Sequence, residues 1–237
     1  MNDETTPGPF DAGHPLAAPV AAWMAESPRF AAFVAANRDK IRKKARGARD
    51  PATLDDLLFE LAVARDLHAA RHATLAYEPR LPGRTRVPDF ALTLPSGAVV
   101  VVEVTRIRPP GGDAPGESAP LDARLAGLVC AKLGQLAPQV PNALVVGVPP
   151  ALLPALDVAA ALRALLTRAE RRALTPREAH EFKAPADFFR HYRHLSALVA
   201  RPWPPAPPAP PATLWLNSQA ARPLPPRLRP ALLPPGA

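Results

Sequence analysis

The sequence predicts an α/β fold in which a mixed sheet is flanked by helices on both sides. An amphipathic helix is expected over residues 51–72, and three short strands follow it in close succession. A second helix then precedes one further apolar strand. Strands joined by short turns pair antiparallel, whereas a strand reached through a helical crossover returns parallel, so this order of elements predicts a mixed sheet.

The helix over residues 51–72 has a clear start and a clear apolar face. Asp50 is expected to cap it and Pro51 to occupy its first turn, because aspartate and proline are favoured at those positions. Apolar residues then recur at helical spacing. They are Leu54, Leu57, Leu58, Leu61, Ala64 and Leu67.

The three strands are expected at residues 74–81, 87–94 and 98–107, and a Pro-Ser-Gly turn joins the second to the third. The third is so rich in valine that it is typical of a strand buried on both faces. Residues 109–120 read as a loop, residues 121–137 as a helix and residues 143–148 as a strand.

The remainder of the chain completes a single domain over residues 19–237 that follows a flexible tail at residues 1–18. Helices are expected at residues 157–173 and 188–200, a strand at 213–217 and a short helix at 225–232. Residues 201–211, RPWPPAPPAPP, lack most backbone donors and predict an extended proline-rich spacer loop.

Composition narrows the class of protein. The chain has 237 residues, 48% of them hydrophobic, with a net charge of +8 and one cysteine. It contains no apolar run long enough to cross a membrane, its first residues do not resemble a secretory signal, and it cannot form an internal disulfide. We therefore expect a cytoplasmic protein with no membrane partner. The positive surplus favours a phosphate-backbone partner, although it also fits a compositional bias toward arginine.

Acidic residues at Glu60, Asp89 and Glu103 stand out from their surroundings. Glu103 interrupts the valine strand, where a carboxylate is costly unless it is paired or bound to a metal. Asp89 lies at the neighbouring strand, and Glu60 lies on or beside the apolar stripe of the preceding helix. Convergence of these acids would suit Mg²⁺ or Mn²⁺, which take oxygen ligands. The alternative for each acid is an ion pair with a nearby arginine.

These residues resemble the motifs of the PD-(D/E)XK nuclease superfamily. The resemblance covers roughly residues 54–148 and rests on Glu60, on Pro88-Asp89 and on Glu103-Val104-Thr105. This segment of the chain is similar to a set of bacterial members of that superfamily that carry the motifs PDF and EVT. The resemblance implies a restriction-endonuclease-like αβββαβ core, metal-dependent cleavage of nucleic acid and a metal site at Glu60, Asp89, Glu103 and the Val104 carbonyl.

One position departs from the motif, because Thr105 stands where the superfamily has lysine. A neutral hydroxyl cannot supply that charge. In one interpretation Lys132 of the following helix replaces it, with Gln135 also facing the site, and the catalytic residues are Asp89, Glu103, Lys132 and Gln135. In the other, the fold is catalytically inactive and serves as a nucleic-acid-binding or protein-interaction module.

A basic run is the first place to expect phosphate contacts. Its residues are Arg38, Lys40, Arg42, Lys43, Lys44 and Arg46. The alternative is a solvated helix face. We expect nucleic acid as the partner, DNA before RNA, and leave a homodimer open.

Overall fold

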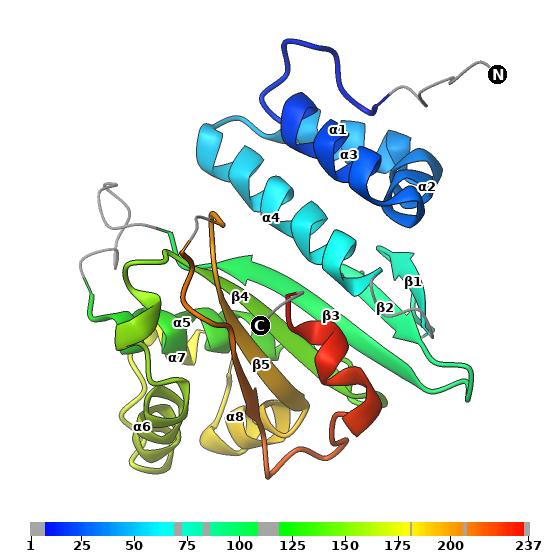
Figure 1. Ribbon diagram of the computed structural model, residues 1–237. Coiled ribbons are helices and arrows are strands. Elements are labelled where there is room, and N and C mark those ends of the chain that lie inside the picture. Colours follow the sequence, from blue (N-terminus) through cyan, green and yellow to red (C-terminus); the bar gives the residue numbers. More distant parts are fainter. Residues whose placement is uncertain are drawn as a thin grey trace, which may run out of the picture.

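The computed structural model describes residues 8–68, 73–82, 86–108, 119–180, 182–205 and 208–234. Within these residues, strands β1 to β6 form one open sheet in chain order (Figure 1). They are β1 (Thr74–Tyr77), β2 (Phe90–Thr93), β3 (Val99–Arg106), β4 (Asn142–Val148), β5 (Leu195–Pro202) and β6 (Thr213–Leu216). Strands β3, β4 and β5 are parallel, and the remaining neighbours pair antiparallel. The predicted α/β class with a mixed sheet is confirmed.

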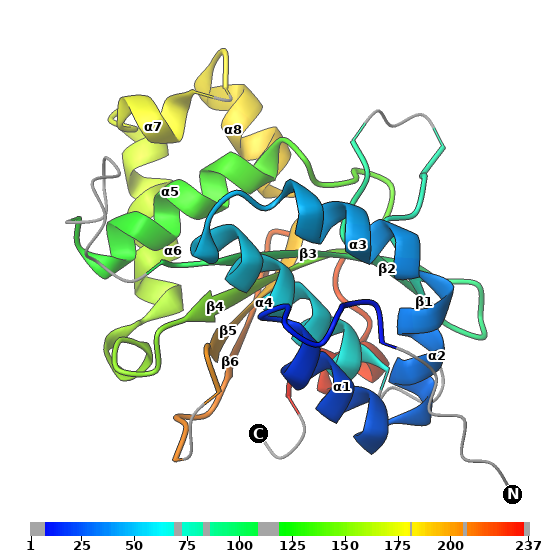
Figure 2. The same ribbon diagram turned by 90° about the horizontal axis from the view of Figure 1, so that it is seen from above.

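Helices cover both faces of the sheet (Figure 2). One face carries α1 (Ala17–Glu26), α2 (Pro28–Ala36), α3 (Arg38–Gly47) and α4 (Pro51–Leu67), together with the 3₁₀ turns η2 (Pro226–Leu228) and η3 (Pro230–Leu232). The other face carries η1 (Leu153–Ala155), α5 (Leu121–Leu133), α6 (Val158–Glu170), α7 (Pro176–Ala179) and α8 (Pro185–Tyr192). Each face has its own buried apolar core, and α4 lies between the N-terminal helices and the sheet.

The side chains of β3 alternate between these two cores. Val102 and Val104 pack with the core under α4, whereas Ile107 packs with the core under α5. Because successive residues of a strand point to opposite faces, Glu103 and Thr105 face α5. The carboxylate of Glu103, which interrupts the valine strand, therefore lies on the side of the sheet opposite to α4.

The start of α4 agrees with the sequence. The Asp50 side chain accepts a hydrogen bond from the Thr53 amide at 2.8 Å, and Pro51 occupies the first turn. The helix ends at Leu67, and the predicted extension over residues 69–72 lies outside the described residues.

The helix predicted over residues 188–200 is wrong in its second half. Helix α8 ends at Tyr192, and β5 begins at Leu195 as a strand buried along its whole length between β4 and β6. A strand covered on both faces loses the polar alternation that identifies strands, so its apolar run could not be told from a buried helix. Arg201 and Pro202 consequently belong to β5 and not to the proline-rich spacer, whose residues 206 and 207 lie outside the described residues.

Both ends of the chain also differ from expectation. Within the predicted tail, residues 1–7 are outside the described residues, whereas Phe10 packs against the core and Leu16 is buried. At the C-terminus the short helix predicted over residues 225–232 consists of two 3₁₀ turns, η2 and η3. Prolines in both turns remove backbone donors, which prevents a continuous α-helix there.

A glycine allows α4 to approach the sheet. A Cβ placed on Gly147 of β4 would lie 2.9 Å from Cγ of Arg106 and 3.0 Å from Cζ of Phe59. We expect Gly147→Ala to lower the free energy of unfolding by about 1–3 kcal/mol, because overpacking forces neighbours out of place. Urea denaturation followed by circular dichroism measures this, and Gly47→Ala, which meets open space, is the matched control. Equal stability of the two variants would contradict the close approach.

Candidate metal site at the β2–β3 fork

Strand β2 stops pairing with β3 before β3 ends, and this divergence creates a fork. The ladder runs only to the pair Phe90 and Val102, while β3 continues to Arg106 beside β4. Past the last pair, the Val104 amide donates a hydrogen bond to Oδ2 of Asp89 at 2.8 Å. The Asp89 backbone is held in turn by the Glu78 amide, which donates to its carbonyl at 2.9 Å. We call Asp89 and Val104 the β2–β3 fork. Here the Asp89 carboxylate accepts the hydrogen bond that a backbone carbonyl of β2 would accept if the two strands still paired.

Glu60 approaches the fork from α4. Its side chain is 13% exposed and accepts a hydrogen bond from Nζ of Lys44 at 2.7 Å. Burial raises the pKa of Glu60, and the negative charge of Asp89 raises it further. Both residues lie beside Val104, because Asp89 accepts a hydrogen bond from its amide and Glu60 lines the same cavity as Val104.

A lysine and a tyrosine complete the surroundings of Glu60. Nζ of Lys44 contacts Glu60 and also Glu78, at 2.9 Å, and lies 5.0 Å from the centre of the Tyr77 ring. Burial alone would lower the pKa of Lys44, but the carboxylates around it raise its pKa above the ordinary value. Burial and the Glu60 charge raise the pKa of Tyr77, so its hydroxyl stays protonated.

Glu103 lies on the other side of the sheet with a different partner. Its side chain is 5% exposed, and Nζ of Lys132 donates to its Oε2 at 3.1 Å. The structure thus brings the predicted Lys132 to the predicted Glu103. Gln135, the fourth residue predicted to be catalytic, donates from its side-chain amide to the Ala131 carbonyl at 3.0 Å. Gln135 follows the end of α5 at Leu133, and this bond joins it to the last turn of that helix.

The donor set suits a hard cation only in part. Glu60, Asp89 and the Val104 carbonyl are oxygen donors, and Mg²⁺ commonly takes one or two carboxylates with water and substrate phosphate completing its shell. However, within the part of the chain that the structure describes, no group of three or more acidic, histidine or cysteine side chains is arranged to hold a metal. The three predicted acids are divided between the two faces of the sheet, and the magnesium or manganese site stays a prediction.

A cavity of about 210 Å³ lies beside the fork on the α4 side of the sheet. It provides space next to Glu60 that the sequence could not reveal. Its walls are Asp56, Phe59, Glu60, Val104, Thr105, Arg106 and Arg108.

Three of the residues that line this cavity, Asp56, Arg106 and Arg108, belong to an ion-pair network that the sequence did not reveal. The buried Arg106 guanidinium pairs with Asp55 and, at 2.7 Å, with Asp56, while Arg108 contacts Asp56 at 2.9 Å. Nε1 of Trp203 donates to Asp55 at 3.0 Å. A nearby arginine was the alternative partner expected for each motif acid, but Arg106 and Arg108 pair instead with acids in the first turns of α4. The adjacent aspartates in that helix were the available signal.

The basic run on α3 is not one solvated face. Lys40 donates to the Tyr77 carbonyl at 2.8 Å, Arg42 donates to the Pro9 carbonyl at 2.6 Å, and Lys44 pairs with Glu60. Arg38 is half-buried, whereas Lys43 and Arg46 are exposed. The phosphate-binding role of this run stays a prediction, and the internal contacts leave Lys43 and Arg46 as its most accessible members.

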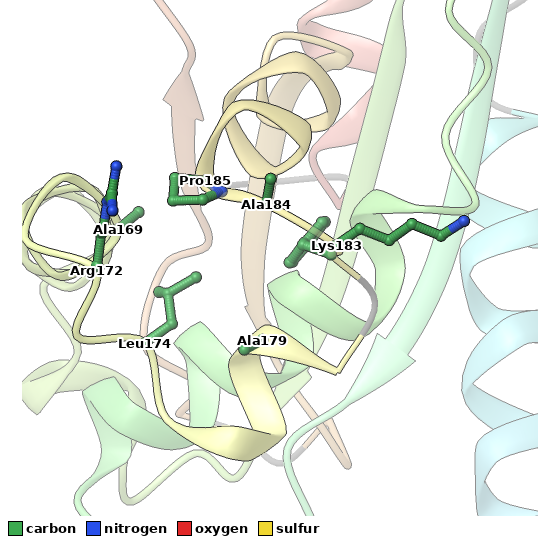
Figure 3. A pocket seen from close by; sticks show the side chains of 8 residues that line it. Ala169, Arg172, Leu174, Ala179, Lys183, Ala184 and Pro185 are labelled. Atoms are coloured by element: carbon green, nitrogen blue, oxygen red, sulfur yellow. The ribbon is translucent and has the colours of Figure 1, made fainter.

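A second cavity, of about 220 Å³, lies among α6, α7 and the start of α8 (Figure 3). Arg172 and Lys183 supply its positive charges, but Figure 3 shows the Lys183 amine extending away from Leu174 and Arg172. The two cations do not converge on one ligand position, so this cavity is a weaker candidate than the fork.

Comparison with protein-family models, with curated proteins and with solved structures finds no significant match to the chain. Across the described residues, every helix falls short of the length and hydropathy needed to cross a bilayer.

Proposed function

We propose that this chain is a metal-dependent nuclease of the restriction-endonuclease-like type that acts on phosphodiester bonds of DNA or RNA. One observation carries the proposal. The carboxylate of Asp89 accepts a hydrogen bond from the Val104 amide at the fork, and Glu60 of α4 lines the same cavity as Val104. Two carboxylates, Glu60 from α4 and Asp89 just before β2, thus lie beside Val104 of β3, whereas Glu103 lies on the opposite face of the sheet.

The order of the elements supports the same proposal. Helix α4 is followed by β1, β2 and β3 as an antiparallel meander, then by α5 and by β4 parallel to β3. This is the αβββαβ order that the motif resemblance implies.

The residues have distinct roles in this proposal. Asp89 and Glu60 would hold Mg²⁺ or Mn²⁺, with the Val104 carbonyl as a further ligand, and a bound ion would stabilise charge on the phosphodiester oxygens. Glu103 lies on the α5 side of β3, where it would position Lys132. Lys132, 3.1 Å from Glu103, would offset the negative charge that develops on the phosphate.

Cleavage of supercoiled plasmid DNA and of single-stranded RNA by the full chain tests this proposal. We expect nicking with Mn²⁺ or Mg²⁺ and none with a chelator. Asp89→Asn should abolish nicking, because it removes a charged ligand while keeping a similar shape. Asp122→Asn, which changes an exposed acid at the start of α5, is the matched control. Nicking that survives Asp89→Asn would remove the fork as the active site.

A second candidate function is nucleic-acid binding without cleavage. The ion pairs that Lys44 and Lys132 make with Glu60 and Glu103 favour it, because both acids already have a cationic partner. Thr105 also lacks the charge of the motif lysine. This candidate predicts binding to labelled duplex DNA that weakens steeply as salt rises, with no product on any metal. Binding that is absent at low salt would rule it out.

A further inference from the structure

We propose that Lys44 is the built-in counter-ion of the Glu60–Asp89 pair and that it competes with a divalent cation for this pair, using Glu78 as its alternative partner. This inference rests on the proposed function, because it concerns the same carboxylates. It assigns a role to a residue of α3, which lies outside the αβββαβ elements.

The packing of α3 holds Lys44 beside Glu60. Ile41 and Ala45, on the same helix, are buried in the core under the sheet, and Lys40 is tied to the Tyr77 carbonyl at 2.8 Å. The Lys44 amine therefore has little freedom to leave. It contacts Glu60 at 2.7 Å and lies over the face of Tyr77.

Without a positive charge nearby, the carboxylates of Glu60 and Asp89 would repel each other, and the burial of Glu60 would strengthen this repulsion. The Lys44 amine offsets this repulsion, and it attaches to the same Glu60 carboxylate that a metal would use. A divalent ion must compete with that amine for Glu60. Two cations a few ångströms apart also repel, so the lysine lowers the affinity for the metal even where both remain bound.

Glu78 makes the exchange feasible. Its carboxylate already lies 2.9 Å from Nζ of Lys44, so the lysine keeps a partner when Glu60 turns away. The buried Tyr77 hydroxyl, on a residue 4% exposed, lies beside Glu60, and the described residues give it no well-formed hydrogen bond. A reoriented Glu60, or a water brought in by the ion, would supply the missing partner.

Titration of the full-length protein with Mn²⁺, followed by calorimetry, tests the inference. We expect Lys44→Met to bind Mn²⁺ about tenfold or more tightly than the wild type, and Lys44→Arg to stay near the wild type. Glu78→Gln should bind Mn²⁺ more weakly, because Lys44 then has only Glu60 as its carboxylate partner. Arg49→Met, which removes an exposed charge just after α3, is the control and should leave the affinity unchanged.

The outcomes separate this inference from the proposed function. If Mn²⁺ binding depends on Asp89 but Lys44→Met leaves it unchanged or weaker, the counter-ion role is wrong and the metal site stands. If neither the wild type nor Lys44→Met binds Mn²⁺ in a way that Asp89→Asn removes, the metal site itself is wrong and both proposals fall. Should Lys44→Met fail to fold, the weakening expected of Glu78→Gln still decides the matter, because unchanged or tighter binding there contradicts the exchange.

Discussion

Asp66→Asn should lower the free energy of unfolding by about 3–5 kcal/mol, because it leaves a buried guanidinium without its charged partner. Asp66 is 4% exposed and contacts Arg201 at 2.6 Å, and Arg201 is itself 5% exposed. Arg65 also contacts Asp66, at 2.8 Å. The pair joins the C-terminal part of α4 to β5, so its loss loosens the contact between the helix and the sheet.

Urea denaturation of Asp66→Asn measures this loss. Asp187→Asn is the control, because Asp187 pairs at the surface with the largely exposed Arg190, and such pairs contribute about 0–1 kcal/mol. The double variant Asp66→Leu/Arg201→Met should recover much of the lost stability, since it removes both buried charges together. An Asp66→Asn protein as stable as the wild type would show that Arg201 finds other compensation.

Lys132→Met should reduce metal-dependent cleavage by about 10²–10³-fold if Lys132 takes the place of the motif lysine, because one preorganised charge near a reacting phosphate is worth that much. The Lys132 amine lies 3.1 Å from Glu103, and Thr105 faces the same side of β3. Adding Thr105→Lys to the Lys132→Met protein should therefore restore part of the activity by returning the cation to the motif position.

Single-turnover cleavage rates on a defined DNA duplex measure this pair of variants, with circular dichroism confirming that each is folded. Lys183→Met, which changes an exposed lysine at the distant cavity, is the control. A rate unchanged by Lys132→Met would exclude Lys132 from the chemistry. Loss of activity without any recovery on adding Thr105→Lys would assign Lys132 a role tied to α5 rather than to the charge itself.

The sequence predicted the elements from α4 to β4 because their patterns are local. Asp50 and Pro51 mark the helix start, and the turn before β3 contains Gly97 with a positive φ of 80°. These features depend on a few neighbouring residues, so they are visible without the fold. Strand β5 was missed for the opposite reason, because burial on both faces removes the alternation by which strands are recognised.

The sequence could predict which acids belong to the candidate site but not how they are placed around the sheet. The hairpin between β2 and β3 is enough to bring Asp89 near the end of β3. The sequence does not reveal which face of the sheet α4 covers, so the placement of Glu60 and Glu103 on opposite sides could not be foreseen. Neither Lys44 nor Glu78 belongs to the nuclease motif. Their contacts arise only because α3 packs against the end of β1.

Anomalous diffraction from crystals of the full chain grown with Mn²⁺ tests the central claim most directly. A metal site at the fork predicts an anomalous peak within bonding distance, about 2.0–2.2 Å, of the Asp89 carboxylate, with Glu60 turned toward it. The same crystals of Asp89→Asn should lack the peak. A fork without a peak at a Mn²⁺ concentration that supports cleavage, or a peak on Asp55 and Asp56 instead, would contradict the assignment of this site.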